Sequence, residues 1–184
     1  MDLKEFHQNI IKDVKTEVME EFDRNFERKA FFDKKWPSNI LVNRKGSMMA
    51  RSNNLRRGYR ARIEGEKIAF SNSMPYASIQ NEGGEITVTA RMKKYFWAMY
   101  YQATGGITYN IKTKAVAKTK KNAHLSIEAE QFKALALMPI GKKIKIPARR
   151  VIGPHPRINE IIQKVVDSHL PAMNNFINSN LKQR

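Results

Sequence analysis

The chain of 184 residues contains no cysteine. Without thiols it can form no disulfide, use no thiolate nucleophile and offer no cysteine-ligated zinc site. It also lacks any run of about 18 apolar residues, the length that a membrane-spanning helix needs. We therefore expect a globular protein with no membrane contact, and its length suits one domain, residues 1–184, with an appended arm.

The usual signatures of catalysis and cofactor binding are missing as well. None of the four histidines has a second histidine four residues away, and there is no Walker loop, dinucleotide fingerprint, nucleophile elbow or H-E-x-x-H motif. Nine of the 17 carboxylates fall in the first 35 residues, interleaved with lysines as on a solvated helix face. We expect no enzymatic activity, no catalytic residue, no metal site and no cofactor.

Acidic residues are also scarce in the second half of the chain. Residues 91–150 hold fourteen Lys and Arg against two Asp and Glu, and they supply most of the net charge of +17. A local basic excess favours a polyanionic neighbour, either nucleic acid or an acidic protein surface. The alternative is a solvated surface that charge keeps soluble. The candidate electrostatic contacts are five lysines within ten residues, Lys112, Lys114, Lys118, Lys120 and Lys121.

Hydrophobic periodicity gives the first half of the chain its expected elements. Apolar residues at steps of three and four predict an amphipathic helix over 3–31, with Glu21 on its solvated outer face. Alternation predicts a β-hairpin over 54–72, whose arginines, Arg56 included, face outward. The sequence after Pro75 favours a short helical turn, which Gly83 and Gly84 end.

The second half adds short strands over 86–89 and 142–152 and a helix that begins near Pro156. Pro171 should kink or interrupt that helix. Together the patterns predict an α+β fold, in which a long N-terminal helix packs on a small antiparallel β-sheet and a C-terminal helix follows.

Between these strands, residues 91–141 form a basic, aromatic arm that reads as helix, flexible tip and returning helix. We expect the returning helix over 126–138, opening at Ser126 with Glu128 and Glu130 in its first turn. The first arm helix carries five aromatic residues in seven positions, Tyr95, Phe96, Trp97, Tyr100 and Tyr101. That density requires cover from a groove, a neighbouring helix or another subunit.

Two short motifs flank the arm: Y-A-S-I-Q-N-E-G-G at 76–84 and I-P-A-R-R-V-I-G at 146–153. With them, over residues 30–170, the chain resembles the Mu-like phage virion morphogenesis (tail completion) family, which is akin to head–tail joining proteins. Gln80 stands where that family often has histidine, and Val151 stands near its usual phenylalanine. The residues that carry the motifs are Tyr76, Gly83, Gly84, Pro147, Arg149 and Gly153.

The resemblance implies a structural subunit of the neck or tail-completion ring that joins the head connector to the tail, with DNA passing through the ring. Its implied partners are its own copies, with a hexamer favoured, portal or connector and tail proteins, and packaged double-stranded DNA in non-specific contact. The implied location is the neck or tail of the virion, assembled in the host cytoplasm. A ring closed by a heterologous interface would explain surplus apolar surface. The candidate interface residues are Tyr95, Phe96, Trp97, Tyr100, Tyr101, Phe176 and Leu181.

Two alternatives remain open at this point. One is a basic, non-specific nucleic-acid-binding protein, whose lysines would give salt-dependent affinity without reading sequence. The other is a phage assembly factor that is absent from the mature virion. For Arg149 and Arg150, the sequence allows either a structural role at the strand end or ordinary surface charge.

Overall fold

The computed structural model describes residues 3–38 and 47–181 and divides the chain into two compact units. The first unit comprises Met1–Pro37, Gly46–Glu82 and Ala148–Arg184, and the second comprises Ser38–Lys45 and Gly83–Pro147. We call the described residues 83–147 the arm. The arm expected over 91–141 lies within it, and the mixture of helices and antiparallel strands in the two units confirms the α+β class.

The long N-terminal helix is confirmed as α1, Leu3–Arg28. It ends three residues before the predicted position because Lys29 takes a left-handed backbone conformation, with φ of 54°. The chain then forms a small hairpin of β1, Ala30–Phe31, and β2, Lys34–Lys35, which the sequence did not predict. The apolar stripe of α1 is buried as expected, at Phe6, Val14, Val18, Phe22 and Phe26.

The expected single sheet is divided into three two-stranded antiparallel ladders within the described residues. The first is β1–β2. The second pairs β3, Tyr59–Glu64, with β4, Lys67–Asn72, around a two-residue turn in which Gly65 has φ of 64°, and it confirms the predicted hairpin. The third pairs β5, Gly84–Thr87, with β6, Lys143–Ile146, inside the arm. Residues before β3 form the short helix α2, Asn54–Gly58, where a strand was predicted.

Two further helices complete the first unit. The predicted short helical turn is α3, Ala77–Glu82. The last helix, α6, Pro156–Leu181, runs through Pro171 without a break, so the predicted interruption is wrong. Pro171 and Asp167 are both exposed, so water can hydrogen-bond the carbonyl that the proline leaves without a helical partner.

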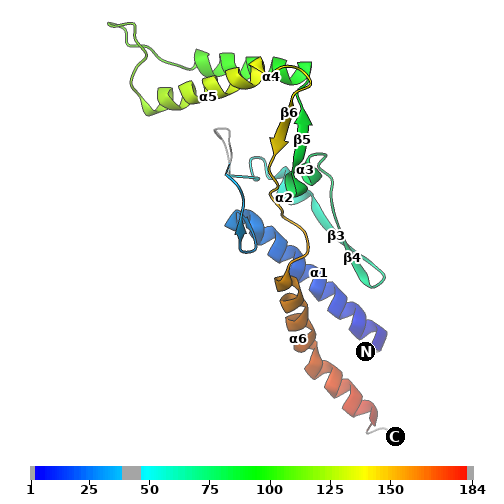
Figure 1. Cartoon of the computed structure of the whole chain (residues 1–184). Coiled ribbons are helices and arrows are strands. Elements are labelled where there is room, and N and C mark those ends of the chain that lie inside the picture. The colour runs from blue at the N-terminus through cyan, green and yellow to red at the C-terminus, as the bar shows by residue number, and fades with distance from the viewer. Residues whose placement is uncertain (1–2, 39–46, 182–184) are drawn as a thin grey trace. The chain divides into compact units, whose positions relative to one another are not determined.

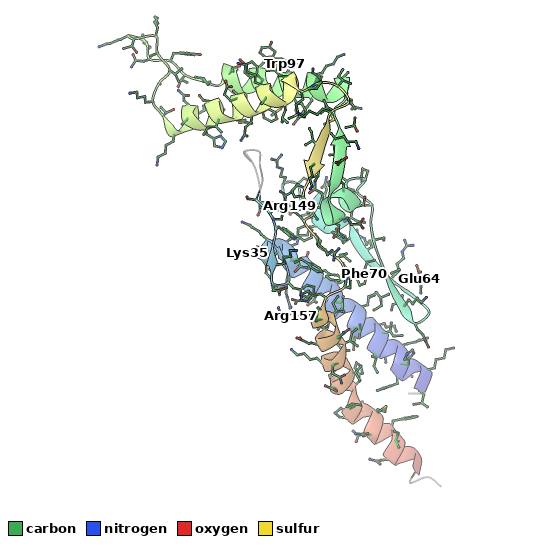
Figure 2. All side chains as sticks on the ribbon, in the orientation of Figure 1. Lys35, Glu64, Phe70, Trp97, Arg149 and Arg157 are labelled. Atoms are coloured by element: carbon green, nitrogen blue, oxygen red, sulfur yellow. The ribbon has the colours of Figure 1, made fainter. Side chains whose placement is uncertain are left out.

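The core of the first unit lies where α1 packs against α6 and the β3–β4 hairpin (Figure 1). Phe22 is central: its ring meets Phe32 at 6.2 Å and Phe70 of β4 at 5.3 Å, both edge to face, and Figure 2 shows Phe70 beside α1. A second cluster gathers around the far end of α1, at Phe26, Trp36, Leu55, Ala77 and Val151. Aromatic packing along one helix therefore joins most elements of this unit.

The segment 148–153 lies against this core without pairing to a strand, with Arg149 and Val151 buried and Arg150 exposed. Asn25 of α1 is fully buried, and its Nδ2 donates to the Val151 carbonyl at 3.0 Å. Its Oδ1 accepts from the Phe32 amide, also at 3.0 Å. One side chain of α1 thus satisfies two backbone groups that lie far apart in the sequence.

Side chains from two other elements satisfy most of what remains. Asn81 of α3 accepts from the amides of Val151, at 2.7 Å, and Ile152, at 3.0 Å, and its Nδ2 donates back to the Ile152 carbonyl. The indole Nε1 of Trp36 donates to the Arg150 carbonyl at 2.7 Å. The segment is therefore held much as a central strand would be, by amide and indole groups in place of a neighbouring backbone.

His155, at the start of α6, connects this helix to the β1–β2 turn. Its ring stacks on Phe32 at 4.1 Å and 9°, and its Nε2 lies 3.0 Å from Asp33 Oδ1. The Arg157 amide donates to Nδ1 at 3.2 Å, which assigns the ring proton to Nε2 and makes Asp33 the acceptor. The histidine is thus a packing and capping residue of the fold.

Two charged residues predicted on solvated faces are instead engaged by the protein. Glu21 is buried, because Arg28 at 2.6 Å and Arg24 at 2.9 Å offset the cost of removing its carboxylate from water. The Arg28 hydrogen bond in particular holds the pKa of Glu21 below its usual range. Arg56 of α2 does not face outward: it bonds Asp23, at 2.6 Å from its Nε, and Glu27 at 2.8 Å.

We expect Asn25→Ala to lower the free energy of unfolding by about 2–4 kcal/mol, because two buried backbone groups lose their partner. The matched control is Asn9→Ala on the same helix, where the side chain is only partly buried; there the change should stay within about 0.5 kcal/mol. Urea unfolding of both variants measures the difference, and equal effects would contradict the role of Asn25.

Glu21 should make the stability depend on pH at the acid end. Since its pKa is lowered from 4.5 in the folded state, its stabilisation is present above that value and is lost as the pH falls through the folded pKa. Glu21→Gln should therefore lose less stability than the wild type between about pH 6 and pH 3. Urea unfolding across this range tests it, with the exposed Glu20→Gln as the control.

Candidate functional site

The arm is built on two antiparallel helices, α4, Ala90–Gly105, and α5, Lys120–Leu137, which lie side by side (Figure 1). This confirms the predicted order of helix, tip and returning helix. The predicted start of the second helix at Ser126 is wrong. The Thr119 hydroxyl accepts from the Asn122 amide at 3.1 Å and caps a helix that begins six residues earlier, so Glu128 and Glu130 lie in its interior.

Small residues allow the two helices to pack closely. Ala103 of α4 and Ala136 of α5 are almost completely buried, and Leu125 fills the end near Gly106. Phe96 is buried in the same interface, with its ring 6.4 Å from Phe132. Phe96, predicted at a subunit interface, therefore serves the packing of the arm itself.

The other aromatic residues of α4 are less buried than Phe96: Tyr95 and Tyr101 are exposed, and Trp97 and Tyr100 are partly buried. Trp97, Tyr100 and Tyr101 contact one another: Trp97 stacks with Tyr101 at 6.0 Å and meets Tyr100 edge to face at 5.6 Å. We call these three residues the aromatic cluster. Figure 2 shows Trp97 on the side of α4 that faces away from α5. Tyr101 is 65% exposed and Tyr95, nearer the helix interface, is 57% exposed. The buried residues of α4 are Phe96 and Ala103, and the cluster lies outside them.

The tip loop, residues 107–119, which was predicted as a flexible segment, forms a hydrogen-bonded turn. The Asn110 amide donates to the Ala115 carbonyl at 2.8 Å, and the Ala117 amide donates to the Thr108 carbonyl at 3.0 Å. Tyr109 and Val116 form an antiparallel bridge between these two bonds. The loop is thus a short two-stranded tongue with defined geometry.

Asn122 fixes the base of this tongue. Its side chain is 1% exposed, and its Nδ2 donates to the carbonyls of Thr108 at 2.8 Å and Ala117 at 2.7 Å. Its Oδ1 accepts from the Thr108 amide at 3.1 Å. One amide therefore clamps both strands of the tongue to α5, a role that the sequence did not reveal.

The five predicted contact lysines are distributed over the tongue and the first turn of α5. All are exposed, and no Asp or Glu occurs between residues 107 and 127. The structure thus gathers one sign of charge at one end of the arm, where it is available to a polyanion. These residues are Lys112, Lys114, Lys118, Lys120 and Lys121.

The motif residues outside the arm have structural roles. Arg149 is buried, its amide donates to the Gln80 carbonyl at 2.7 Å and its Nε donates to the Pro37 carbonyl at 3.0 Å. Burial lowers the pKa of this guanidinium. Arg149 is therefore not ordinary surface charge, and the 76–84 and 146–153 motifs meet through Gln80 and through Asn81. Figure 2 shows Arg149 at this junction.

The remaining predicted residues are dispersed. Tyr76 is 41% exposed before α3, Gly83 takes φ of 77° to end α3, and Phe176 is partly buried on α6. Leu181 is the last residue of α6, and its side chain lies outside the described residues. Gly84 and Ile146 pair at the base of the arm, Pro147 follows, and Gly153 lies against the Arg150 side chain.

Side chains that could bind a metal or catalyse a reaction do not cluster in the described part of the chain. No three His, Cys, Asp or Glu side chains there are placed to hold a metal ion. An open hollow between α1 and the β3–β4 turn is lined by Lys4, His7, Lys12 and Glu66 among others, without a nucleophile beside a base. No helix among the described residues has the length and apolarity to cross a bilayer.

No protein family model, no curated protein and no solved structure matches this chain. Its function therefore has to be inferred from its own residues, and above all from the aromatic cluster and the basic tongue.

We expect Asn122→Ala to release the tongue, because both strands lose their bonds to α5. The amides of Thr108 and Ala117 should exchange with solvent faster, and the arm should lose about 1–3 kcal/mol of stability. Hydrogen exchange measured by mass spectrometry reports both effects. Asn174→Ala, on an exposed site of α6, is the control, and unchanged exchange in the tongue would show that Asn122 does not hold it.

Proposed function

We propose that the chain is a non-enzymatic structural subunit of a tailed-phage neck, a tail-completion protein whose copies form a ring between the head connector and the tail. The observation that carries the proposal is the aromatic cluster. The α4–α5 hairpin buries Phe96 and small residues in its own interface, whereas Tyr101 is exposed and Trp97 and Tyr100 are only partly buried. Tyr and Trp are the residues most enriched at the centres of protein interfaces.

A ring requires two different surfaces on each copy, one for each neighbour. The second half of α6 supplies a candidate for the other surface. Residues 168–181 contain no Asp, Glu, Lys or Arg, and Leu170 and Ile177 are 38% and 41% exposed. In a chain with a net charge of +17, copies repel each other, and uncharged surfaces are where that repulsion is weakest.

The motif residues support the same proposal. The resemblance to tail-completion proteins rests on the 76–84 and 146–153 segments, and these contact each other through Gln80, Asn81 and Arg149. Residues that are distant in sequence and joined in space form a structural signature, which is a stronger basis for a family proposal than two isolated motifs. Six copies are favoured by that resemblance.

DNA passage through such a ring would bring a polyanion past the subunits. The exposed lysines of the tongue suit a sequence-independent contact with it, and the same basic end favours nucleic-acid binding as a second function of the chain. Portal, connector and tail proteins would form the remaining contacts of the subunit in the virion.

The double variant Trp97→Ala/Tyr101→Ala should weaken assembly by several hundred-fold, roughly 30-fold for each aromatic anchor, because such anchors contribute about 2 kcal/mol or more each. Native mass spectrometry and electron microscopy of the purified chain measure the ring. Tyr109→Ala, which removes an exposed tyrosine elsewhere in the arm, is the matched control and should assemble normally.

A wild-type chain that stays monomeric at all concentrations, alone and with connector proteins, would contradict the proposal. Mass spectrometry of purified particles adds an independent test: a neck subunit is present in them, whereas an assembly factor is absent.

A further inference from the structure

Ile111 occupies an unusual place in the tip loop. Its side chain is 86% exposed, the highest fraction among the large apolar residues that the structure describes. It lies at the apex of the tongue, next to Lys112 and three residues from Lys114, both exposed. Burying an isoleucine side chain is worth about 1.5–3 kcal/mol, so this apex has binding energy to offer a partner.

The apex is held in one conformation before any partner arrives. Asn110 Oδ1 accepts from the amides of Lys112 at 2.9 Å and Thr113 at 3.2 Å, and the Lys114 amide donates to the Asn110 carbonyl at 2.9 Å. Lys114 completes the turn with φ of 57°. Binding through such a loop requires little ordering of the backbone, because the Asn110 turn and the Asn122 clamp have already fixed it.

The charges around Ile111 favour nucleic acid over a protein or a membrane. Lys112 and Lys114 lie near it in the chain, three more exposed lysines follow at 118, 120 and 121, and no carboxylate lies between residues 107 and 127, which matches a uniformly negative backbone. Ile111 has Asn110 and Lys112 as its sequence neighbours at the apex, and the other exposed apolar residues of the loop, Tyr109 and Val116, pair with each other across the tongue. An apolar side chain that projects beside cations fits a wedge that enters between base pairs.

We propose that the tip loop binds duplex DNA, with its lysines on the phosphates and Ile111 inserted as a wedge between base pairs from the minor groove. This extends the DNA contact in the proposed function from electrostatics to a local deformation of the duplex. The lysines would supply affinity that depends on the salt concentration. Ile111 would unstack and kink the DNA, and these effects would not depend on salt. The two contributions can therefore be measured separately.

The test uses the full-length chain and a DNA duplex that carries 2-aminopurine at a flexible TA step. Binding of the wild type should raise the 2-aminopurine fluorescence, because the base is unstacked, and should shorten the end-to-end distance measured by energy transfer. Ile111→Ser should abolish both signals and weaken binding roughly tenfold, with an unchanged slope of log affinity against log salt.

Ile127→Ser is the matched control, since Ile127 is an isoleucine of the same arm that is 55% exposed on α5. It should behave as the wild type. Conversely, Lys112→Gln/Lys114→Gln should reduce the salt slope by about 2, whereas Lys142→Gln/Lys145→Gln at the other end of the arm should leave it unchanged.

The wedge is refuted if the wild type binds DNA without unstacking it, or if Ile111→Ser and Ile127→Ser behave alike. It is also refuted if the chain binds no duplex DNA. In that case, binding to phosphatidylserine–phosphatidylcholine vesicles that Ile111→Ser removes would show that the tip binds a membrane. These outcomes do not bear on the proposed ring, because ring assembly is measured without DNA and with variants of Trp97 and Tyr101. A chain that forms no ring but unstacks DNA would contradict only the proposal that it is a neck subunit.

Discussion

A stretch of irregular backbone held without a strand partner is the constraint around which the first unit is organised. Arg149 and Val151 of this stretch are buried, so backbone groups there need hydrogen-bond partners within the protein. Asn25, Asn81 and Trp36 provide those bonds from three separate elements. The positions of α1, α3 and the β1–β2 hairpin are therefore coupled through the single segment 149–152. This coupling explains why a unit with only two-stranded ladders can hold its helices in register.

The arm uses the same device on a smaller scale. Asn122 bonds both strands of the tongue as Asn25 and Asn81 bond the segment 149–152. A carboxamide can donate and accept at once, so it can stand in for a peptide group wherever a regular ladder is missing. It carries no charge, and its burial therefore avoids the large desolvation cost of an ionic group. Both units thus obtain rigidity from few residues, which suits units with small cores.

Periodicity predicted the elements that depend on local pattern. The stripe of α1, the β3–β4 hairpin with its glycine turn, and α4 followed from spacing alone. What failed depended on distant partners. An asparagine in a sequence signals a turn or cap, and nothing in it reveals that Asn25 bonds a carbonyl 126 residues away. In the site, lysines and aromatic residues were recognisable by type, but Phe96 could be separated from Trp97 only once α5 showed which face it covers.

The pairing of Gly84 with Ile146 places the two ends of the arm on neighbouring strands. Their Cα atoms are therefore only about 5 Å apart, the spacing of an antiparallel pair. The residues between Gly84 and Ile146 therefore begin and end at paired positions, so the length of this insertion can change while its two ends stay in place. The geometry therefore allows the helices and the tongue to be lengthened, shortened or replaced by engineered grafts at the same two positions.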